Sequence, residues 1–467
     1  IITSIVLFVK GYQTDKIFLL VIALAVSAMP EGLSLALTLA LVVASNRMAK
    51  KNVIVKKLNA VESLGSCTVI ASDKTGTLTV NEQTAREIIL KDGEVFTISG
   101  SGYNGEGEVT AIDNANISNA ENIAFLGYIN NEASLKYTNG HWESFGDSID
   151  IAFLSLAKKL KVNKKEKILN TVPYESENQY SAVFYEEDGE IYCTAKGSLE
   201  KIMSLSEEKE LYKTQNTELT SKGYRVIALC HGKVNGTGIK DIKNLSFVGM
   251  VSFIDPIRED VKDSLKECEA ASIKVVMITG DHPLTAYAIA KELGLCKHKT
   301  EIATGEDIKK YRGMGEREFD NYIKNIRVFA RVTPIDKLDI VNSYKRQGEF
   351  VAVTGDGVND APAIKAANIG ISMGSGTDVA KETSSMIITD DNFTSIVSGI
   401  KEGRTAYNNI RKITLFLLGC GVSEVLFFLL SIAFGYDVPL VAIQLLWLNL
   451  VTDGLQDVAL SFEKNEK

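Results

Sequence analysis

A seven-residue loop, Asp73–Thr79, follows directly on a short apolar stretch and constrains the fold most strongly. The stretch Cys67–Ser72 is apolar with β-branched residues, which predicts a buried strand. Open α/β sheets bind ligands beyond the carboxyl ends of their parallel strands, and Asp73 stands at such an end. Lys74 and the hydroxyl residues of the loop favour an anionic ligand such as phosphate. The loop is therefore either a ground-state binding loop or the carrier of a carboxylate nucleophile for a phosphoryl group.

Two later apolar runs and the start of one predicted helix also carry polar residues that suit phosphate or Mg²⁺. The apolar run Val275–Ile278 predicts a buried strand that ends in Thr279–Asp281, where a hydroxyl is placed to bind a phosphoryl oxygen. Lys337 stands at the start of a predicted helix. The run Phe350–Thr354 predicts another strand, and it enters a glycine-rich loop whose oxygen ligands suit Mg²⁺. The polar residues of that loop are Asp356, Asn359 and Asp360.

Turn and cap residues mark the ends of several elements. Pro283 and Gly294 bound a predicted helix over Pro283–Leu293. The polar cluster Glu186–Gly189 lies between two β-like runs and predicts a hairpin.

Apolar residues are concentrated at the two ends of the 467-residue chain, and the middle is polar and charged. The length is enough for several domains. A net charge of −8 implies no general affinity for nucleic acid. The six cysteines form no Cys-x-x-Cys pair, so we expect neither a zinc site nor a redox framework.

The apolar ends predict helices that cross a membrane and carry polar groups. The segment 17–45 is long enough to span a bilayer, and Pro30 must break its helix beside Glu31. Freed carbonyls and a carboxylate in hydrocarbon would form a cation site. Segments 412–434 and 438–460 predict two more spans. The oxygen-bearing residues of these two are Glu424, Asn449, Thr452 and Asp453.

Charged residues that flank the apolar segments predict their orientation. The loop Gly435–Asp437 contains no lysine or arginine, whereas basic residues follow the first span and precede the second. The positive-inside rule therefore places the polar middle of the chain in the cytoplasm. Residues 1–9 read as the tail of a truncated helix.

Three of these motifs resemble one family. The heptapeptide Asp73–Thr79 resembles the phosphorylation signature of P-type ATPases, which are ion pumps that pass through an aspartyl-phosphate. Pro30–Leu33 resembles the fourth transmembrane helix of the type II pumps, and Trp447–Gly454 resembles the sixth helix of calcium pumps. The resemblance implies ATP as substrate, Mg²⁺ held by Asp73, Thr75 and Asp356, and a lipid bilayer as the setting.

The resemblance also implies the fold class and the domains. We expect a multidomain α/β protein with membrane helices, in which a haloacid-dehalogenase-like Rossmannoid phosphorylation domain contains an inserted α+β nucleotide-binding domain. The expected ranges are 57–83 and 251–403 for phosphorylation and 84–250 for nucleotide binding. The implied catalytic residues are Asp73, Lys74, Thr75, Thr279, Gly280, Asp281, Lys337, Asp356, Asn359 and Asp360.

The resemblance to the same family also implies a nucleotide pocket, which we assign one residue at a time. Lys196–Glu200 resembles the family's Lys-Gly-Ala-Pro-Glu, and Tyr174 falls where the family stacks an aromatic ring on adenine. Asp150 falls in an adenine-side acidic position, and Arg225 matches an arginine that contacts phosphates. The expected ATP residues are Asp150, Tyr174, Lys196, Gly197, Arg225 and Arg258.

The function implied is ATP-driven cation transport, with Ca²⁺ export across a prokaryotic plasma membrane as the leading interpretation. Gly421 stands where two-site calcium pumps have asparagine, which leaves open either one calcium per cycle or another cation, such as Mn²⁺, Na⁺, K⁺ or H⁺. A membrane-anchored phosphatase is a further alternative. Thr75 argues against it, because simple phosphatases of this superfamily often have a second aspartate there to act as the base.

One tripeptide matches a motif of the same family by coincidence. Thr304–Glu306 repeats the Thr-Gly-Glu of the family's actuator domain, but it lies inside the expected phosphorylation domain, before a polar helix. We therefore expect a fragment, with the actuator domain and the remaining helices elsewhere in the full-length protein.

Overall fold

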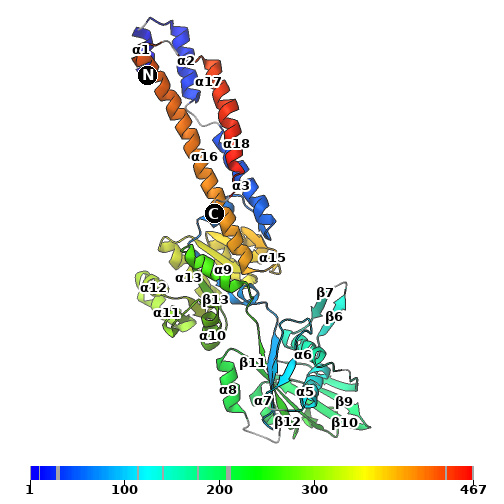
Figure 1. Ribbon diagram of the computed structural model, residues 1–467. Helices are drawn as coiled ribbons and strands as arrows, with labels where there is room; N and C mark the ends of the chain where they lie inside the picture. The colour runs from blue at the N-terminus through cyan, green and yellow to red at the C-terminus, as the bar shows by residue number, and fades with distance from the viewer. Residues whose placement is uncertain are drawn as a thin grey trace.

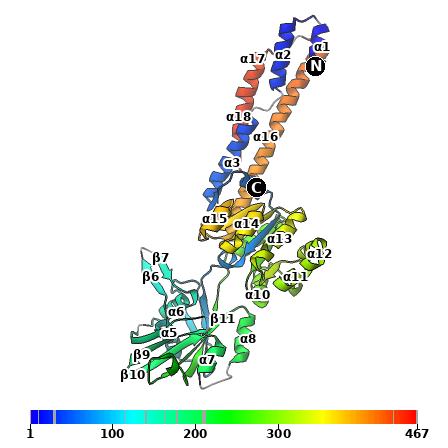
Figure 2. The same ribbon diagram turned by 180° about the vertical axis from the view of Figure 1, so that it is seen from behind.

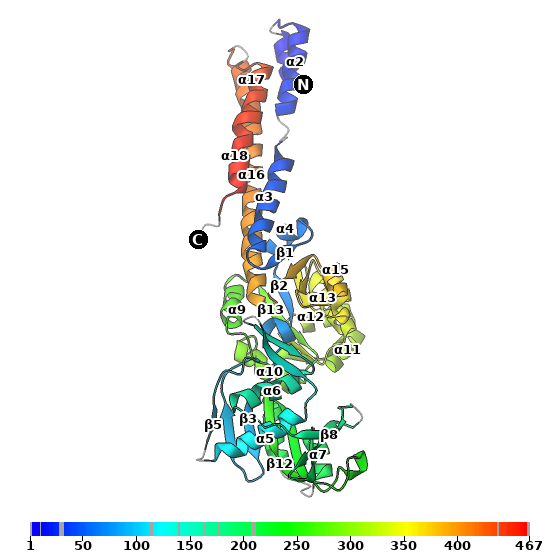
Figure 3. The ribbon, with the colours of Figure 1, turned by 90° about the vertical axis from the view of Figure 1, so that its right-hand side faces the viewer.

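In a computed structural model the chain forms a bundle of helices, a parallel sheet with helices and an antiparallel sheet with helices (Figure 1). The structure describes residues 2–9, 11–27, 32–112, 115–138, 141–162, 164–175, 178–206, 212–436 and 439–464. The parallel sheet lies between the other two parts when the molecule is seen from the front, from behind and from the side (Figures 1, 2 and 3).

The central sheet has eight strands in the order β1-β18-β17-β16-β2-β13-β15-β14, and only β1 and β18 pair antiparallel. Its strands are apolar because helices cover both faces. The strands are β1 (Val53–Val55), β2 (Val69–Asp73), β13 (Lys274–Thr279), β14 (Ile302–Thr304), β15 (Val328–Ala330), β16 (Val351–Gly355), β17 (Ile369–Met373) and β18 (Met386–Ile388).

Two apolar cores flank this sheet. One face packs on α4 (Asn59–Gly65), α9 (Val261–Ala270), α10 (Pro283–Leu293) and the start of α16 (Phe393–Ala433). The other face packs on α11 (Gly305–Met314), α12 (Glu316–Ile323), α13 (Pro334–Arg346), α14 (Ala361–Ala366) and α15 (Asp378–Thr383). The strand register aligns Asp73 of β2 with Ile278 of β13, so the polar ends of these strands meet at one edge, as predicted.

The second sheet is antiparallel, in the order β5-β4-β3-β12-β11-β10-β9-β8, and it is inserted between β2 and β13. The predicted α/β architecture with an inserted α+β unit is confirmed. The strands are β3 (Thr84–Leu90), β4 (Val95–Ile98), β5 (Val109–Ala111), β8 (Lys167–Val172), β9 (Tyr180–Glu187), β10 (Glu190–Gly197), β11 (Arg225–Lys233) and β12 (Ser246–Ile254).

Helices also cover this sheet on two sides. One core contains α5 (Ile117–Ile129) and α6 (Ser148–Lys159), and the other contains α7 (Leu199–Leu205) and α8 (Lys213–Ser221). A separate hairpin, β6 (Ser134–Thr138) and β7 (His141–Phe145), extends from the side of α6.

Several predicted element ends are confirmed. The hairpin of β9 and β10 turns through Asp188 and Gly189, both with positive φ, as a two-residue hairpin requires. Helix α10 begins at Pro283 and ends at Gly294 with φ +76°. Thr304 caps α11: its hydroxyl accepts from the Asp307 N–H, which gives this threonine a structural role.

The bundle differs from the predicted spans in how its helices are divided. The predicted segment 17–45 forms α2 (Thr14–Ser27) and α3 (Leu33–Ala49), and Pro30 and Glu31 lie outside the described residues. The predicted segment 438–460 forms three abutting pieces, the middle one a π-helix. The other elements of the bundle are α1 (Ile2–Val9), α17 (Ala442–Trp447), η5 (Leu448–Asp453) and α18 (Gly454–Ser461).

Helix α16 joins the bundle to the parallel sheet without interruption. The predicted domain end at 403 and the predicted span from 412 both fall within α16, which is one helix of 41 residues. Its first turns pack into the sheet core through Phe393 and Ile396, and its last turns pack on α1 through Phe428. Among the described helices, α16 alone is long and apolar enough to cross a membrane.

Helices α4 and α16 cross with their backbones in contact at two glycines. A Cβ placed on Gly65 would lie 2.5 Å from the carbonyl carbon of Gly403. A Cβ on Gly403 would lie 2.7 Å from the Gly65 nitrogen. Both neighbours are backbone atoms, which cannot move aside as a side chain can.

Replacing Gly65 by alanine should therefore destabilise the protein, by about 1–3 kcal/mol for an overpacked site. Thermal unfolding of the detergent-solubilised protein measures the effect. Gly419→Ala is the matched control, because Gly419 lies on α16 and a Cβ added there would have no atom within 4 Å. Equal unfolding temperatures for the two variants would contradict this account of the crossing.

Candidate active site

Asp73 ends β2 and lies at the carboxyl edge of the parallel sheet. Its N–H donates to Thr354 Oγ1 at 2.9 Å, so the neighbouring strand β16 holds this strand end in place. The loop then turns through Gly76, whose φ of 74° is one that glycine adopts without strain. Thr79 closes the loop, because its N–H and its hydroxyl both donate to the Lys74 carbonyl oxygen.

A buried lysine lies beside two carboxylates of this edge. Lys337, in the first turn of α13, donates to Asp360 Oδ1 at 2.7 Å and to the Thr354 carbonyl oxygen at 3.0 Å. Its Nζ is 4.0 Å from Asp73 Oδ2. Burial raises the pKa of Asp73 to about 6, Lys337 opposes that rise, and the carboxylates of Asp360 and Asp356 add to it.

The carboxylates of Asp73, Asp356 and Asp360 offer oxygen atoms that all lie within 4.8 Å of one another. Asp360 is oriented by the N–H groups of Asp356 and Gly357, which donate to its Oδ2. Burial, followed by the charge of Asp360, raises the pKa of Asp356. Three carboxylates beside one lysine leave negative charge uncompensated, and hard oxygen ligands suit Mg²⁺. Asp360 was predicted as a catalytic residue and not as a metal ligand, so its place in this group is new.

The predicted phosphate-binding residues Thr279, Gly280 and Asp281 follow β13. The Asp281 N–H donates to Thr279 Oγ1 at 3.1 Å. The Asp281 carboxylate pairs with Lys74 at 2.7 Å, so Lys74 is directed toward β13. Nothing lies within 4 Å of a methyl position on Gly280, which leaves open space at this strand end. Asn359 is exposed on the opposite loop.

A cavity of about 620 Å³ lies between the inserted unit and the parallel sheet. Lys74 and Asp281 line it from the sheet, and Gly223 and Arg225 line it from the inserted unit. The two parts approach closely, since a Cβ on Gly223 would lie 3.2 Å from the Thr285 methyl group.

A second cavity, of about 420 Å³, lies within the inserted unit. The structure brings five of the six predicted ATP residues together in its lining: Asp150, Tyr174, Lys196, Gly197 and Arg225. Arg225 lines both cavities, so one side chain connects this pocket with the cleft above Lys74.

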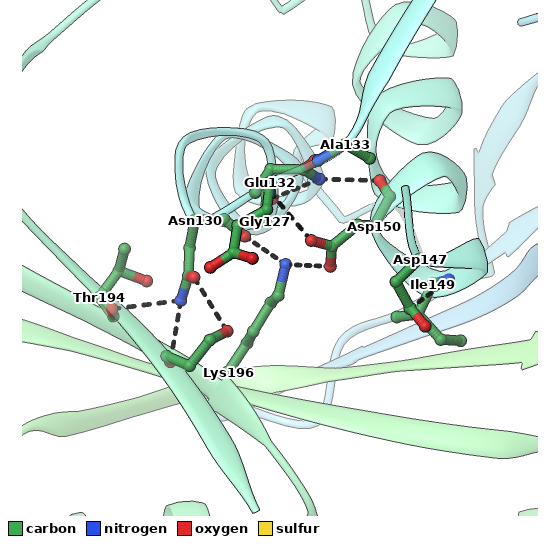
Figure 4. Close-up of polar contacts among 11 residues, drawn as sticks. Gly127, Asn130, Glu132, Ala133, Asp147, Ile149, Asp150, Thr194 and Lys196 are labelled. Carbon is green, nitrogen blue, oxygen red and sulfur yellow. Dashed lines mark hydrogen bonds and ion pairs between the residues drawn. The ribbon is translucent and has the colours of Figure 1, made fainter. Parts of the chain in front are cut away.

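Lys196 lines this second cavity, and several polar contacts hold its side chain in place (Figure 4). Its Nζ pairs with Asp150 Oδ1 at 2.6 Å and donates to the Asn130 carbonyl oxygen. Asn130 is itself fixed through its amide, which donates to the carbonyl oxygens of Ser181 and Thr194. Burial lowers the pKa of Lys196, and Asp150 opposes that shift.

Two exposed aromatic rings line the same cavity. Tyr174, predicted from the sequence, is 57% exposed, and Phe145 at the end of β7 is 80% exposed. We did not predict Phe145 from the sequence. Its position, just before Gly146 and the helix-capping Asp147, was a usable signal. A flat, solvent-accessible ring is a suitable platform for a nucleobase.

Arg258, the sixth predicted ATP residue, does not line this cavity, and its role in ATP binding stays a prediction. Its Nε donates to the Thr79 carbonyl oxygen at 3.2 Å and its Nη2 to that of Gly76 at 3.4 Å. The neighbouring Asp255 accepts from Thr79 Oγ1 at 2.5 Å and from the Asn81 N–H at 2.7 Å. Both residues therefore tie the segment that leaves the parallel sheet to the segment that returns to it. Arg258 follows β12 in the chain, which is why it contacts the loop rather than the pocket.

The predicted cation residues are only partly within the described structure. Glu424 is buried on α16, and Asn449 lies on η5. Thr452 and Asp453 belong to η5, their side chains are not described, and Glu31 lies outside the described residues.

Comparisons with known proteins agree with this geometry. The family described as haloacid dehalogenase-like hydrolase matches residues 67–368, and the family described as cation transporting ATPase, C-terminus, matches residues 437–467. A calcium-transporting ATPase of Bacillus subtilis is 38% identical over 98% of this chain and 54% of its own length. The human calcium-transporting ATPase type 2C member 2 is 34% identical over 98% of this chain and 50% of its own length.

The chain thus spans about half the length of the curated relatives it matches. The residues of the parallel-sheet edge, from Asp73 to Asp360, lie inside the matched hydrolase range. The chain therefore belongs to the haloacid dehalogenase-like hydrolase family and, within it, to the P-type ATPases.

Proposed function

We propose that this chain carries the phosphorylation, nucleotide-binding and part of the membrane machinery of an ATP-driven cation pump, with Ca²⁺ as the transported ion. The observation that carries the proposal is the position of Arg225, which connects the Lys196 cavity with the cavity lined by Lys74 and Asp281. A nucleotide with its base at Tyr174 or Phe145 would direct its phosphates past Arg225 toward Asp73. The relatives named as calcium-transporting ATPases support Ca²⁺ as the ion.

In this mechanism Asp73 attacks the γ-phosphorus of ATP. The new bond joins an Asp73 carboxylate oxygen to phosphorus, the bond to the β-phosphate bridging oxygen breaks, and ADP leaves. Lys337 and Thr279 stabilise the charge on the transferred phosphoryl oxygens. Mg²⁺, when held by Asp73, Asp356 and the backbone at Thr75, supplies the counter-charge that the phosphates need. Asp360 orients Lys337 through the 2.7 Å ion pair.

The phosphoenzyme should persist, because no carboxylate stands at residue 75 to activate water. Thr75 is neutral near pH 7 and cannot act as a general base. We propose that hydrolysis is completed by an actuator domain in the full-length protein, outside these 467 residues. Persistence is useful to a pump, since the phosphorylated state must last while the membrane helices move.

The membrane part of the proposal rests on α16 and its neighbours. We place the bundle in the plasma membrane of a prokaryote, with both sheets on the cytoplasmic side. Glu31, Glu424, Asn449, Thr452 and Asp453 form the proposed cation site. Because α16 passes from the sheet core into the bundle as one helix, movement of the phosphorylation domain would be transmitted to Glu424.

Asp73→Asn should abolish phosphoenzyme formation from ATP in the full-length protein, because the amide is not a nucleophile for phosphorus. The measurement is acid-stable, hydroxylamine-sensitive label from ATP that carries ³²P at the γ-position. Asp263→Asn is the control, since that carboxylate is 82% exposed on α9 and pairs only with Lys266 in the described structure. Label retained by Asp73→Asn would contradict the assignment of the nucleophile.

Tyr174→Ala should weaken the binding of a non-hydrolysable ATP analogue about tenfold, since stacking of a base on an aromatic ring contributes about 1–3 kcal/mol. Tyr137→Ala is a matched control, because Tyr137 is 63% exposed and packs on Trp142 outside the cavity. Phe145→Ala tests the second ring of the cavity. If both cavity variants bind the analogue as the control does, the adenine does not stack in this pocket.

Asp73→Asn should also raise thermal stability in metal-free buffer at pH 7.5, by on the order of 2 kcal/mol. The folded pKa of about 6 exceeds the ordinary value of 3.8, so the stability linked to the protonated carboxyl is present below pH 4 and lost as pH rises through 6. The neutral amide avoids this loss, and Mg²⁺ should stabilise the wild type more than the variant. Calorimetry at pH 4 and 7.5 measures both effects. A variant less stable than the wild type at pH 7.5 without Mg²⁺ would contradict the claim that the ionised Asp73 carboxylate destabilises the folded protein.

A further inference from the structure

A group of basic side chains lies at the amino edge of the parallel sheet, where its strands begin. They line a cavity of about 550 Å³ beside α9, the end of α10 and the start of β13. Lys274 is the first residue of β13, and Arg327 directly precedes β15. Asp73 is aligned with Ile278, four residues further along β13, so the two edges are roughly 13 Å apart at about 3.3 Å per residue. The cavity is therefore separate from the proposed phosphorylation site.

The Lys274 amine is held in place but has no counter-charge. Its Nζ donates to the Lys324 carbonyl oxygen at 2.7 Å and lies 5.0 Å from the centre of the Tyr344 ring. Among the residues that the structure describes, it has no ion-pair partner and no second hydrogen-bond acceptor. Burial, followed by the charge of Arg327, lowers the pKa of Lys274 to about 8, and Glu349 opposes the shift. Two of the three ammonium donors are thus available to an anion.

Arg327 lines the same cavity, and its backbone is fixed between two neighbouring segments. Its N–H donates to the Glu301 carbonyl oxygen at 2.8 Å, and its carbonyl oxygen accepts from the Met277 N–H at 2.9 Å. Within the described ranges, its guanidinium group forms no hydrogen bond and no ion pair. A guanidinium offers five N–H donors in a planar fork that matches the geometry of a phosphate.

The other charged side chains of the cavity do not pair with these two cations. The lining contains five basic side chains and two acidic ones. Two of the other lysines pair with carboxylates of α9 and α10, at 2.8 Å and 3.5 Å. The Glu301 carboxylate accepts from two backbone N–H groups, and Glu269 is exposed. Lys274 and Arg327 are therefore the cations of this cavity that are both half-buried and unpaired within the described structure.

We propose that this cavity binds a small molecule through a phosphate group, which Lys274 and Arg327 contact. A phosphate monoester carries about −1.5 to −2 charges near pH 7, which matches two unpaired cations better than a single carboxylate does. Leu265, Leu293 and Leu295 line the same cavity and give apolar surface for an organic group attached to the phosphate. Pockets for small molecules commonly have this size and this mixture of apolar surface with a few polar groups. The inference goes beyond the proposed pump function and does not depend on it.

The alternative role for these residues is structural, with Lys274 closing the end of the sheet through the Lys324 carbonyl oxygen. The two roles respond differently to the loss of charge. Glutamine at residue 274 keeps a donor for that carbonyl oxygen but removes the positive charge. Arg327 has no side-chain hydrogen bond to lose within the described structure, so Arg327→Gln should leave the fold intact.

The test is equilibrium dialysis of ³²P-labelled inorganic phosphate with the full-length protein in metal-free buffer at pH 7. Without Mg²⁺, the three carboxylates beside Asp73 repel phosphate from the other edge of the sheet. Lys274→Gln and Arg327→Gln should each weaken phosphate binding at least tenfold, and Arg327→Lys should recover part of the loss. Lys309→Gln is the matched control, because it removes one exposed lysine from α11, which packs on the opposite face of the sheet.

Thermal unfolding shows which variants are folded. Unchanged phosphate affinity in folded Lys274→Gln and Arg327→Gln would overturn the site, as would a wild type that binds no phosphate at millimolar concentration. If Lys274→Gln does not fold, Arg327→Gln decides alone: weakened binding supports the site and unchanged binding overturns it.

The phosphate group recognised here could belong to a soluble molecule or to a lipid headgroup. The same dialysis in lipid nanodiscs separates the two sources. If nanodiscs that contain phosphatidic acid reduce the binding of labelled phosphate relative to pure phosphatidylcholine nanodiscs, the site accepts a lipid phosphate. Equal binding in the two kinds of nanodisc supports a soluble phosphorylated ligand.

Discussion

The arrangement at the edge of the parallel sheet depends on one lysine that balances several carboxylates. Lys337 is almost fully buried, pairs with Asp360 and lies 4.0 Å from the Asp73 carboxylate. One positive charge cannot neutralise the three carboxylates that converge there, which is why burial and repulsion together raise the pKa of Asp73 to about 6. The site is thus incomplete without further positive charge, and this incompleteness is what a metal-bound nucleotide would satisfy. We propose that Asp73 is reactive because the surrounding residues do not fully neutralise the charge at this site.

Two sets of contacts connect this sheet edge with the inserted unit and with the helical bundle. Toward the inserted unit, Asp255 accepts from the Thr79 hydroxyl and Arg258 donates to the Thr79 carbonyl oxygen. We propose that the two connecting segments act as one hinge. Toward the bundle, α16 continues from the sheet core to Glu424. The backbones of α4 and α16 are in contact at Gly65 and Gly403. We propose that a change at Asp73 is transmitted through these contacts to the Lys196 cavity and to Glu424.

The sequence predicted best what depends on local chemistry and on strand order. Pro283 and Gly294 bound α10 because a proline fits the first turn and a positive φ ends a helix. Asp73, Thr279 and Asp356 converge because parallel strands bring their carboxyl ends to one edge. Features that depend on three-dimensional packing escaped prediction. Neither the continuity of α16 nor the π-helical turn at Leu448–Asp453 has a local signal. Phe145 had one, because it lies just before the helix-capping Asp147, but its place in the cavity depends on packing. Arg258 does not line the cavity shared by the other five predicted ATP residues, because a basic residue after a strand can face either the pocket or the loop.

The central claim is that Asp73 itself receives the phosphoryl group. The most direct measurement is chemical identification of the modified residue in the full-length protein, incubated with ATP, Mg²⁺ and Ca²⁺ and then reduced with borohydride. Reduction converts an aspartyl-phosphate to homoserine, which mass spectrometry locates in the peptide. We predict homoserine at residue 73, dependent on ATP and on Ca²⁺. Homoserine at another aspartate, or a phosphate found only on serine, threonine or histidine, would contradict the account.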